Sequence, residues 1–278
     1  MITTRLGGRL GNQMFQYAIA RALSIRHGFD FAMDVSSLDF PYALHPFNII
    51  EKFADPFPEI IRRRNWIAYD PEQLAGKDNI SFDGVWQSYC YFEDCKDTIK
   101  SDFTLRDPLS PNTVKMSTIM QQHPESVCLS IRRGDFAKWP QIFPILTEKF
   151  YRDAVGRIPN AHFFIFSDEP KWAKDNVHYT PSDHTTFVDL NEEGSGYKTG
   201  REHEDLYLMS LCKHSIMANS SFSWWGSYLR KNPGMTFYPR PWFSDKRIQA
   251  ETTTLFLPEW VAVDSAEPGR SLRWTARR

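Results

Sequence analysis

The second half of the chain alternates short apolar runs with helix-like segments, and this alternation limits the possible fold more than any other feature. The apolar runs predict strands at residues 127–131, 161–166, 186–189, 215–218 and 235–238. Helical patterns between them predict helices at residues 147–157, 204–212 and 219–230. Regular alternation of strands and helices is typical of a doubly wound α/β protein with a parallel sheet.

The N-terminal residues predict a second unit of the same kind. Residues 2–5 fit a short strand, and a glycine-rich loop at residues 7–12 follows it. From Asn12 the apolar residues fall on one helical face until Gly28, which suits a helix end, and residues 29–35 alternate as the next strand. This order predicts a βαβ unit.

The middle of the chain is rich in proline and phenylalanine and gives a weaker pattern. Residues 85–89 fit the end of a strand, and residues 112–122 fit a short helix beside a domain connection. We therefore expect an N-terminal lobe at residues 1–115, a C-terminal lobe at 116–263, and a polar, mobile tail at 264–278.

Composition fits a globular protein with a buried core. Of the 278 residues, 41% are hydrophobic and 24% are charged, and the formal net charge is -1. This length is enough for two modest α/β domains. A near-neutral chain gives no electrostatic reason to expect a nucleic-acid partner.

The cysteines and the N-terminus bear on the compartment. Four cysteines without a CxxC spacing favour reduced thiols, and hence the cytoplasm. The N-terminus lacks the apolar stretch of a signal peptide, and no run approaches the roughly 18 apolar residues of a membrane-spanning helix. We expect a cytoplasmic protein with no integral membrane segment, able to associate peripherally with the inner face of the membrane.

Two arginines follow a predicted strand at the position where open α/β sheets bind ligands, beyond the carboxyl end. Arg132 and Arg133 come directly after the strand at 127–131, and a guanidinium fork matches the oxygens of a phosphate. A surface salt bridge with Asp135 is the alternative interpretation.

Two other strand ends carry polar groups. Ser167 and Asp168 follow one strand, where Asp168 offers a carboxylate to a guanine or a ribose and either residue alternatively caps the next helix. Residues 219–222 open a helix whose free N–H groups and dipole make an anion site, with helix capping again the alternative. Both positions fit the binding of a nucleoside diphosphate.

The sequence offers no pattern for a metal or a dinucleotide. No Asp-x-Asp occurs, although many nucleotide-sugar transferases hold a divalent ion on the diphosphate with that pattern. The eight histidines are scattered, and the acidic residues around His203 suit a helix start. The glycine spacing in residues 7–12 differs from the dinucleotide fingerprint. We expect no metal and no cofactor, with arginines and a helix N-terminus in place of the ion.

Several segments, in order along the chain, resemble the motifs of the α-1,2-fucosyltransferases, glycosyltransferase family 11. They are residues 8–18 (GRLGNQMFQYA), 131–136 (IRRGDF), 164–168 (FIFSD), 205–214 with 218–225 (DLYLMSLCKH and ANSSFSWW), and 239–243 (PRPWF). The first and the longest of these are highly specific. Two positions depart from the family pattern, because Ser130 stands where members commonly have His and Glu169 where many have a second Asp.

The resemblance implies a GT-B architecture, in which two Rossmann-like lobes face each other across the active site. The lobe at 1–115 would lie on the acceptor side and the lobe at 116–263 would bind the donor, with residues 40–115 shaping the acceptor specificity. It implies an inverting, metal-independent transfer of L-fucose from GDP-β-L-fucose to the 2-hydroxyl of a galactoside, with an α-1,2 linkage in the product. The partners would be GDP-fucose, as a substrate, and a galactose-containing acceptor such as a surface glycan or O-antigen precursor. The chain resembles bacterial members that have no membrane anchor.

On this resemblance we expect Arg133 to stabilise the β-phosphate as the glycosidic bond breaks and Arg132 to brace the loop, with the reverse assignment open. Asp135 is the nearest candidate for a general base, with a structural role as the alternative, and Glu148 is a remote one. Further donor contacts, some of them from the other lobe, are expected from Asn12, Gln13, Ser167, Asp168, Asn219, Ser220, Ser221 and Phe222.

Three other functions stay open at this level. They are a transferase for another nucleotide sugar, a nucleotide-sugar binding module without turnover, and a redox enzyme that binds NAD. The departures at Ser130 and Glu169 favour the binding module, and the intact arginines oppose it. The spacing of the glycine loop speaks against the redox enzyme.

Overall fold

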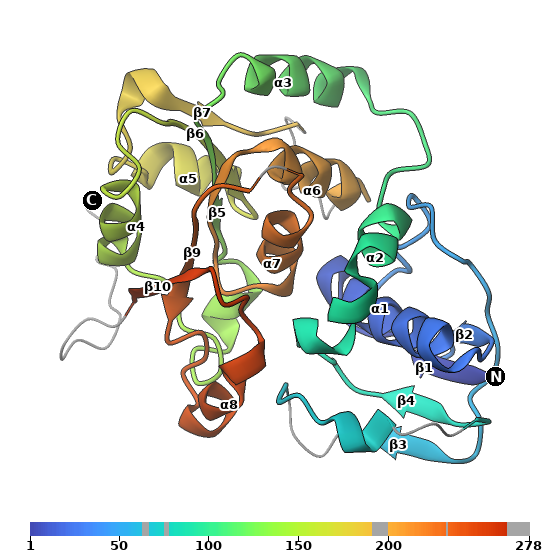
Figure 1. Ribbon diagram of the computed structural model, residues 1–278. Coiled ribbons are helices and arrows are strands. Elements are labelled where there is room, and N and C mark those ends of the chain that lie inside the picture. The colour runs from blue at the N-terminus through green and yellow to red at the C-terminus, as the bar shows by residue number, and fades with distance from the viewer. Residues whose placement is uncertain (63–66, 75–77, 191–199, 232, 266–278) are drawn as a thin grey trace.

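The computed structural model describes residues 1–278 except 63–66, 75–77, 191–199, 232 and 266–278, and it places them in two lobes (Figure 1). Each lobe is built on its own parallel β-sheet. This is the two-lobed α/β arrangement that the GT-B resemblance implied. The tail predicted at 264–278 lies almost wholly outside the described residues.

The N-terminal lobe contains a four-stranded sheet in the order β2-β1-β4-β3, in which every neighbouring pair is parallel. Its strands are β1 (Ile2–Arg5), β2 (Phe31–Asp34), β3 (Ile60–Arg62) and β4 (Ser81–Asp83). Helix α1 (Leu10–His27) joins β1 to β2, which confirms the predicted βαβ unit. Gly28 ends α1 in the left-handed conformation, with a φ of 69°.

Helix α1 is buried on nearly all sides, whereas its apolar pattern predicted one buried face. Phe15 and Ile19 of the predicted face are fully buried, but so is Ala20 on the other side. The cause is the position of α1, which packs on its own sheet, on α2 (Lys96–Asp102) and on α7 (Ser221–Tyr228) of the other lobe (Figure 1).

The region between β2 and α2 holds little regular structure beyond β3 and β4. It also contains three short 3-10 helices, η1 (Pro71–Leu74), η2 (Tyr89–Tyr91) and η3 (Glu93–Cys95). The strand predicted at 85–89 is wrong, because Trp86 has a left-handed backbone with a φ of 51°, outside the β region. This turn buries the Trp86 indole against the rings of Phe82 and Tyr91.

The C-terminal lobe contains a six-stranded sheet, also wholly parallel, in the order β10-β9-β8-β5-β6-β7. Its strands are β5 (Ser126–Ile131), β6 (His162–Ser167), β7 (Thr185–Phe187), β8 (His214–Ile216), β9 (Thr236–Arg240) and β10 (Val261–Asp264). The alternation in the sequence predicted β5 to β9. It missed β10, because four residues beside a polar segment give too short a pattern.

Helices cover both faces of this sheet. The helices of this lobe, besides α7, are α3 (Pro111–Gln121), α4 (Glu148–Val155), α5 (Pro170–Asn176), α6 (Glu202–Leu211) and α8 (Lys246–Ala250), and it also contains the short 3-10 helices η4 (Asp135–Lys138), η5 (Ser182–His184) and η7 (Thr252–Thr254). In β5, Val127 and Leu129 pack with α4 and α5, whereas Cys128 packs with α3 and α6. The carboxyl ends of the strands are thereby left as the open edge for a ligand.

The connection between the lobes precedes α3. Helix α3 packs on α6, so the boundary predicted at residue 115 falls inside a helix of the C-terminal lobe. Glu204 of α6 fastens the start of α3, because its carboxylate accepts hydrogen bonds from Ser110 N at 2.7 Å and from Thr113 Oγ1 at 2.8 Å.

One close contact between the lobes joins the first turn of α1 to the first turn of α7. A Cβ at Gly11 would lie 2.5 Å from Phe222 N and 2.7 Å from Ser221 Oγ, so that only glycine fits there without movement. Trp225 Nε1 also donates to Gly11 O at 3.1 Å. The two walls of any cleft between the lobes are therefore held together at this point.

Replacing Gly11 with Ala is expected to destabilise the protein by about 1–3 kcal/mol, the usual cost of overpacking, because the new methyl meets the backbone of α7. Thermal unfolding without ligand measures this cost as a lower Tm. Gly7→Ala is the matched control in the same loop, since the nearest atom to a Cβ there is Asp39 Oδ1 at 3.8 Å. Equal melting temperatures for the two variants would contradict the tight contact.

Candidate active site

A cavity of about 360 Å³ lies between the lobes, at the carboxyl ends of the C-terminal strands. The glycine loop and the start of α1 form its N-terminal wall. Across the sheet, its other wall consists of Trp242 and Phe243 after β9, Asn219 to Phe222 after β8, Arg132, Asp135 and Phe136 after β5, Ser167 and Asp168 after β6, and Val188 to Leu190 after β7. Strand order thus sets these groups in a row over four strand spacings, or roughly 19 Å.

The two adjacent arginines have different surroundings. Arg132 lines the cavity, whereas Arg133 is not among the lining residues. The Arg133 guanidinium lies 3.7 Å from the centre of the Trp172 ring, and its Nε donates to Glu169 Oε2 at 3.1 Å. Successive side chains of an extended chain project to opposite sides, which accounts for the separation. This placement favours Arg132 as the phosphate-binding residue, the reverse of the two predicted roles.

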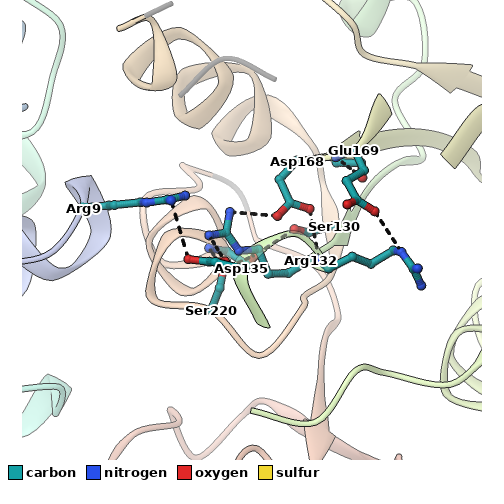
Figure 2. Close-up of polar contacts among 10 residues, drawn as sticks. Arg9, Ser130, Arg132, Asp135, Asp168, Glu169 and Ser220 are labelled. Atoms are coloured by element: carbon teal, nitrogen blue, oxygen red, sulfur yellow. Dashed lines mark hydrogen bonds and ion pairs between the residues drawn. The ribbon is translucent and has the colours of Figure 1, made fainter. Parts of the chain in front are cut away.

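Two carboxylates hold the Arg132 guanidinium in the cavity wall (Figure 2). Its Nη1 lies 3.1 Å from Asp168 Oδ2, and its Nη2 lies 2.5 Å from Asp135 Oδ1. The Phe136 ring covers the same guanidinium at 5.3 Å. A guanidinium that is fixed in this way loses little freedom when it binds an anion, so the position is preorganised.

Asp135 lies between arginines of the two lobes. Its Oδ2 is 3.6 Å from Arg9 Nη2 of the N-terminal lobe, while its Oδ1 binds Arg132 (Figure 2). This arrangement favours the structural interpretation of Asp135, because its carboxylate is engaged by a guanidinium group of each lobe. Glu148, the other predicted base, pairs with Arg152 on α4 and is not among the lining residues.

Asp168 packs against the loop that carries Arg132 and Arg133, and only 5% of its side chain is exposed. Its Oδ1 accepts a hydrogen bond from Arg133 N at 3.0 Å. Burial raises the pKa of Asp168, while the Arg132 guanidinium and the Arg133 N–H oppose the rise. The predicted cap is wrong, because no side chain caps α5. Ser167 Oγ instead accepts a bond from Glu169 N at 3.0 Å, in the turn before that helix.

The N-terminus of α7 opens onto the cavity. Ser220 caps the helix, because its Oγ accepts a hydrogen bond from Ser223 N at 3.1 Å, and this confirms the capping interpretation. Ser221 and Phe222 supply the next N–H groups, which have no acceptor within the helix. Together with the helix dipole these groups suit an anion, so capping by Ser220 is compatible with the anion site that the sequence predicted, which stays a prediction.

A chain of hydroxyl groups links this helix start to β5. Ser130 Oγ lies 2.6 Å from Ser223 Oγ, which lies 2.9 Å from Ser220 Oγ. Ser130 stands at the position that is commonly His in the family. The serine found here connects the strand that carries the arginine loop to the cap of α7.

Asn12 and Gln13 of α1 differ in their surroundings. Asn12 lines the cavity, as predicted, and its Oδ1 also accepts a hydrogen bond from Ser221 Oγ at 2.8 Å, which joins the two lobes. Its predicted contact with the donor stays a prediction. Gln13 is fully buried, and its amide binds Gly8 O at 2.9 Å and Ala43 N at 2.9 Å. The prediction that Gln13 faces the cleft is therefore wrong.

Asn219 fastens two loops to the start of α7. Its Nδ2 donates to Pro144 O at 3.0 Å and to Trp242 O at 3.1 Å, and only 1% of the residue is exposed. Its Oδ1 is buried without a hydrogen bond among the described residues. Asn219 therefore positions the cavity wall, and its predicted contact with the donor stays a prediction.

The sequence reasoning missed the acidic end of the cavity, which consists of Asp189, Glu202 and Asp205. Burial, together with the charges of Glu202, Glu204 and Asp189, raises the pKa of Asp205 to about 7. Burial also raises the pKa of Glu202. The sequence did carry a signal for this acidic end, because Asp205 begins the longest family motif. Acidic residues at a helix start are, however, also explained by their favourable interaction with the helix dipole.

The part of the chain that the structure describes has neither a metal-binding group nor a membrane-spanning helix. No three His, Cys, Asp or Glu side chains are grouped there so that they could hold a metal ion. Within the same residues, no helix is both long enough and apolar enough to cross a membrane. Arg9, Arg132 and the N-terminus of α7 are groups in the cavity wall that suit an anion.

A cavity between two α/β lobes, with a guanidinium and a helix N-terminus at its centre, is typical of the two-lobed transferases that use nucleotide sugars. Comparison with known proteins identifies the particular family. Residues 1–264 match the family model described as glycosyl transferase family 11, and the chain belongs to that family.

Individual relatives agree with this assignment. An alpha-1,2-colitosyltransferase of Escherichia coli is 30% identical over 90% of this chain and 95% of its own length. Galactoside alpha-(1,2)-fucosyltransferase 1 of Lagothrix lagotricha is 27% identical over 93% of this chain and 73% of its own. In structure, the chain is similar to NodZ alpha-1,6-fucosyltransferase soaked with GDP-fucose, with a TM-score of 0.50, 16% identity and coverage of 84% and 96%. The last similarity supports the GT-B fold.

Replacing Asp205 with Asn is expected to stabilise the ligand-free protein, and by more at pH 7.5 than at pH 4.5. The folded-state pKa of about 7 lies above the ordinary aspartate value of 3.8, so the folded protein binds more protons between these values and loses stability as pH rises through them. Asn removes that loss. Thermal unfolding at both pH values measures the gain.

The matched control for this prediction is Asp183→Asn, because the Asp183 side chain is 80% exposed. It should shift Tm little at either pH. An Asp205→Asn gain that is absent, or that is the same at both pH values, would show that the carboxylate is not buried as described.

Proposed function

We propose that the protein is an inverting, metal-independent glycosyltransferase that moves an L-fucosyl or a colitosyl group from a GDP-sugar to the 2-hydroxyl of a galactoside. The observation that carries the proposal is Arg132, held in the interlobe cavity by Asp135 and Asp168, close to the N-terminus of α7. Family membership supports the glycosyl transfer. The α-1,2 linkage in the names of both relatives supports the position of attack.

The reaction breaks the bond between C1 of the sugar and the β-phosphate oxygen, and negative charge grows on the departing GDP. Arg132 and the N–H groups of Ser221 and Phe222 stabilise that charge, and they are in place before the reaction begins. C1 gains oxocarbenium character, as in other glycosyl transfers. The acceptor hydroxyl attacks the opposite face and releases its proton, which converts a β-linked donor into an α-linked product.

Charge neutralisation without a metal is consistent with the cations at the cavity. Arg132 belongs to the C-terminal lobe, and Arg9 of the N-terminal lobe lies 3.6 Å from the carboxylate of Asp135. A diphosphate between the lobes would meet guanidinium groups from both sides. These arginines take the role that a divalent ion has in enzymes with an Asp-x-Asp pattern.

The nucleoside end of the donor is assigned to the acidic end of the cavity. An ionised carboxylate accepts two hydrogen bonds, which match the N1–H and the exocyclic amino group of guanine. Asp205 supplies such a carboxylate, with the apolar side chains of Val188 and Leu190 in the same part of the lining. Asp168, the residue predicted for this role, is instead engaged by the arginine loop.

The donor sugar is the point on which the two relatives differ. Colitose is L-fucose without its 3-hydroxyl group, so the two donors differ by one hydrogen-bonding group. A site that hydrogen-bonds this hydroxyl rejects the deoxy sugar by a large factor, whereas an apolar site discriminates little. A competition assay with GDP-fucose and GDP-colitose separates these two cases.

Replacing Arg132 with Ala is expected to lower kcat about 10²–10³-fold, the usual effect of removing one group that stabilises the leaving charge. Arg132→Lys should recover only part of the loss, because an ammonium lacks the guanidinium fork. Arg133→Ala, which removes the stacking on Trp172, is the matched control and should cost less. A larger loss in Arg133→Ala would return the phosphate-binding role to Arg133.

A transfer assay with a panel of nucleotide sugars and acceptors tests the function itself. We expect GDP-fucose or GDP-colitose to be used, and GDP-mannose and UDP-galactose to be used at least tenfold less well. NMR of the product should show an α-1,2 linkage to galactose. The rate should stay the same with excess EDTA, because arginines replace the metal. Loss of activity with EDTA and recovery with Mg²⁺ would refute the metal-independent mechanism.

A further inference from the structure

Near β9, the cavity is lined by aromatic side chains that take no part in the reaction proposed above. This aromatic wall consists of Phe136, Trp139, Phe143, Trp242 and Phe243. The rings of Phe136 and Phe143 are stacked with their centres 4.4 Å apart, and the Phe143 and Phe243 rings are 5.7 Å apart. These three phenylalanine rings therefore form one continuous apolar surface within the wall.

The aromatic wall lies opposite the acidic end of the cavity. Phe243 follows β9, Arg132 follows β5, and Asp189 follows β7, and these strands lie in that order across the sheet. The wall residues of the loop after β5 reach the β9 side through the contact of Phe143 with Phe243. A donor with its diphosphate at Arg132 and its guanine at Asp205 must extend its sugar toward the wall. The acceptor, which attacks the sugar from the far side, then lies against the wall.

Trp139 is the most exposed ring of the wall. Its relative exposure is 54%, whereas Trp242 and Phe243 are almost fully buried. Among the exposed large apolar side chains of the described residues, only Trp139 and Phe40 line the cavity, one from each lobe. Phe40 is 39% exposed and lies under the Arg9 guanidinium at 4.9 Å. Exposed aromatic surface in a cleft is typical of a ligand-binding position.

The loop that carries Trp139 is held by hydrogen bonds of its own. Trp139 N donates to Phe136 O at 3.1 Å, and Phe143 N donates to Trp139 O at 2.9 Å. Ser244 N donates to Ile142 O at 2.9 Å, which ties the loop to the segment after β9. The backbone under the ring is thus fixed before a ligand arrives, which reduces the ordering cost of binding.

The charges beside the wall favour a neutral ligand. Arg9 and Asp135 form an ion pair across the cleft, while the carboxylates of Asp189, Glu202 and Asp205 lie at the far end. A pyranose ring is neutral and presents C–H groups on one face, which suit the negative face of an aromatic ring. Its hydroxyl groups remain at the edge, where one of them can reach C1 of the donor.

We propose that Trp139 and Phe40 form the acceptor subsite, and that the Trp139 indole is the platform on which the galactopyranose ring stacks with its 2-hydroxyl toward the donor. This inference rests on the proposed function, because it takes the acceptor to be a galactoside. It also places part of the acceptor site on the C-terminal lobe, whereas the sequence predicted that residues 40–115 shape the acceptor specificity.

Steady-state transfer and ligand binding of Trp139→Ala and Trp139→Phe test the subsite. We expect Trp139→Ala to raise the KM for the galactoside about tenfold or more, with the KM for the GDP-sugar and the Kd for GDP unchanged. Trp139→Phe, which keeps an aromatic face, should recover most of the loss. Phe53→Ala is the matched control, because Phe53 is 49% exposed but is not among the lining residues.

Saturation-transfer NMR of methyl β-galactoside with the GDP complex separates the failure of this inference from the failure of the proposed function. Binding to the wild type that is lost in Trp139→Ala supports the subsite, even if no sugar is transferred. Transfer by the wild type with an unchanged galactoside KM in Trp139→Ala overturns the subsite and leaves the function standing. A weaker Kd for GDP in Trp139→Ala, or no galactoside binding to either protein, also overturns it.

Discussion

The approach of α1 to α7 at Gly11 is the contact on which the site depends. The glycine loop that forms one wall of the cavity runs directly into α1, and the N–H groups that can hold an anion begin α7. Asn12 and Trp225 add hydrogen bonds across the same contact. The distance between the two walls is thus set by a backbone-to-backbone approach, which changes less than contacts between long side chains.

The charges of the cavity follow the order of the strands. Arg132 lies in the middle, the acidic side chains around Asp205 lie toward β7, and the aromatic wall lies toward β9. Such a separation is costly in the empty protein, since burial and, after it, the like charges of Glu202 and Asp189 raise the pKa of Asp205. Perturbed carboxylates of this kind are concentrated in functional sites, where a ligand later compensates for the cost.

The sequence predicted the repeating parts of this structure and missed the parts set by distant contacts. The apolar run of β5 could be recognised in the sequence, because both faces of this strand are buried under helices. Periodicity near residues 85–89 was misleading, since the left-handed turn at Trp86 is imposed by its burial among other rings. Adjacent arginines marked the right loop, but only the surroundings of Arg132 and Arg133 show which one faces the cavity. Motif position likewise could not distinguish a bracing amide such as Gln13 from a ligand-binding one.

The core around α1 also contains Trp224 and Trp225 of α7 and Leu255 beyond it. The N-terminal lobe therefore completes its interior with side chains that the C-terminal lobe provides. Lobes built in this way are not interchangeable modules, because a lobe taken from a distant relative would bring half of an interior fitted to a different partner. Evolution of a new donor or acceptor preference in this scaffold is consequently directed to the loops at the strand ends, where substitutions leave the common interior intact.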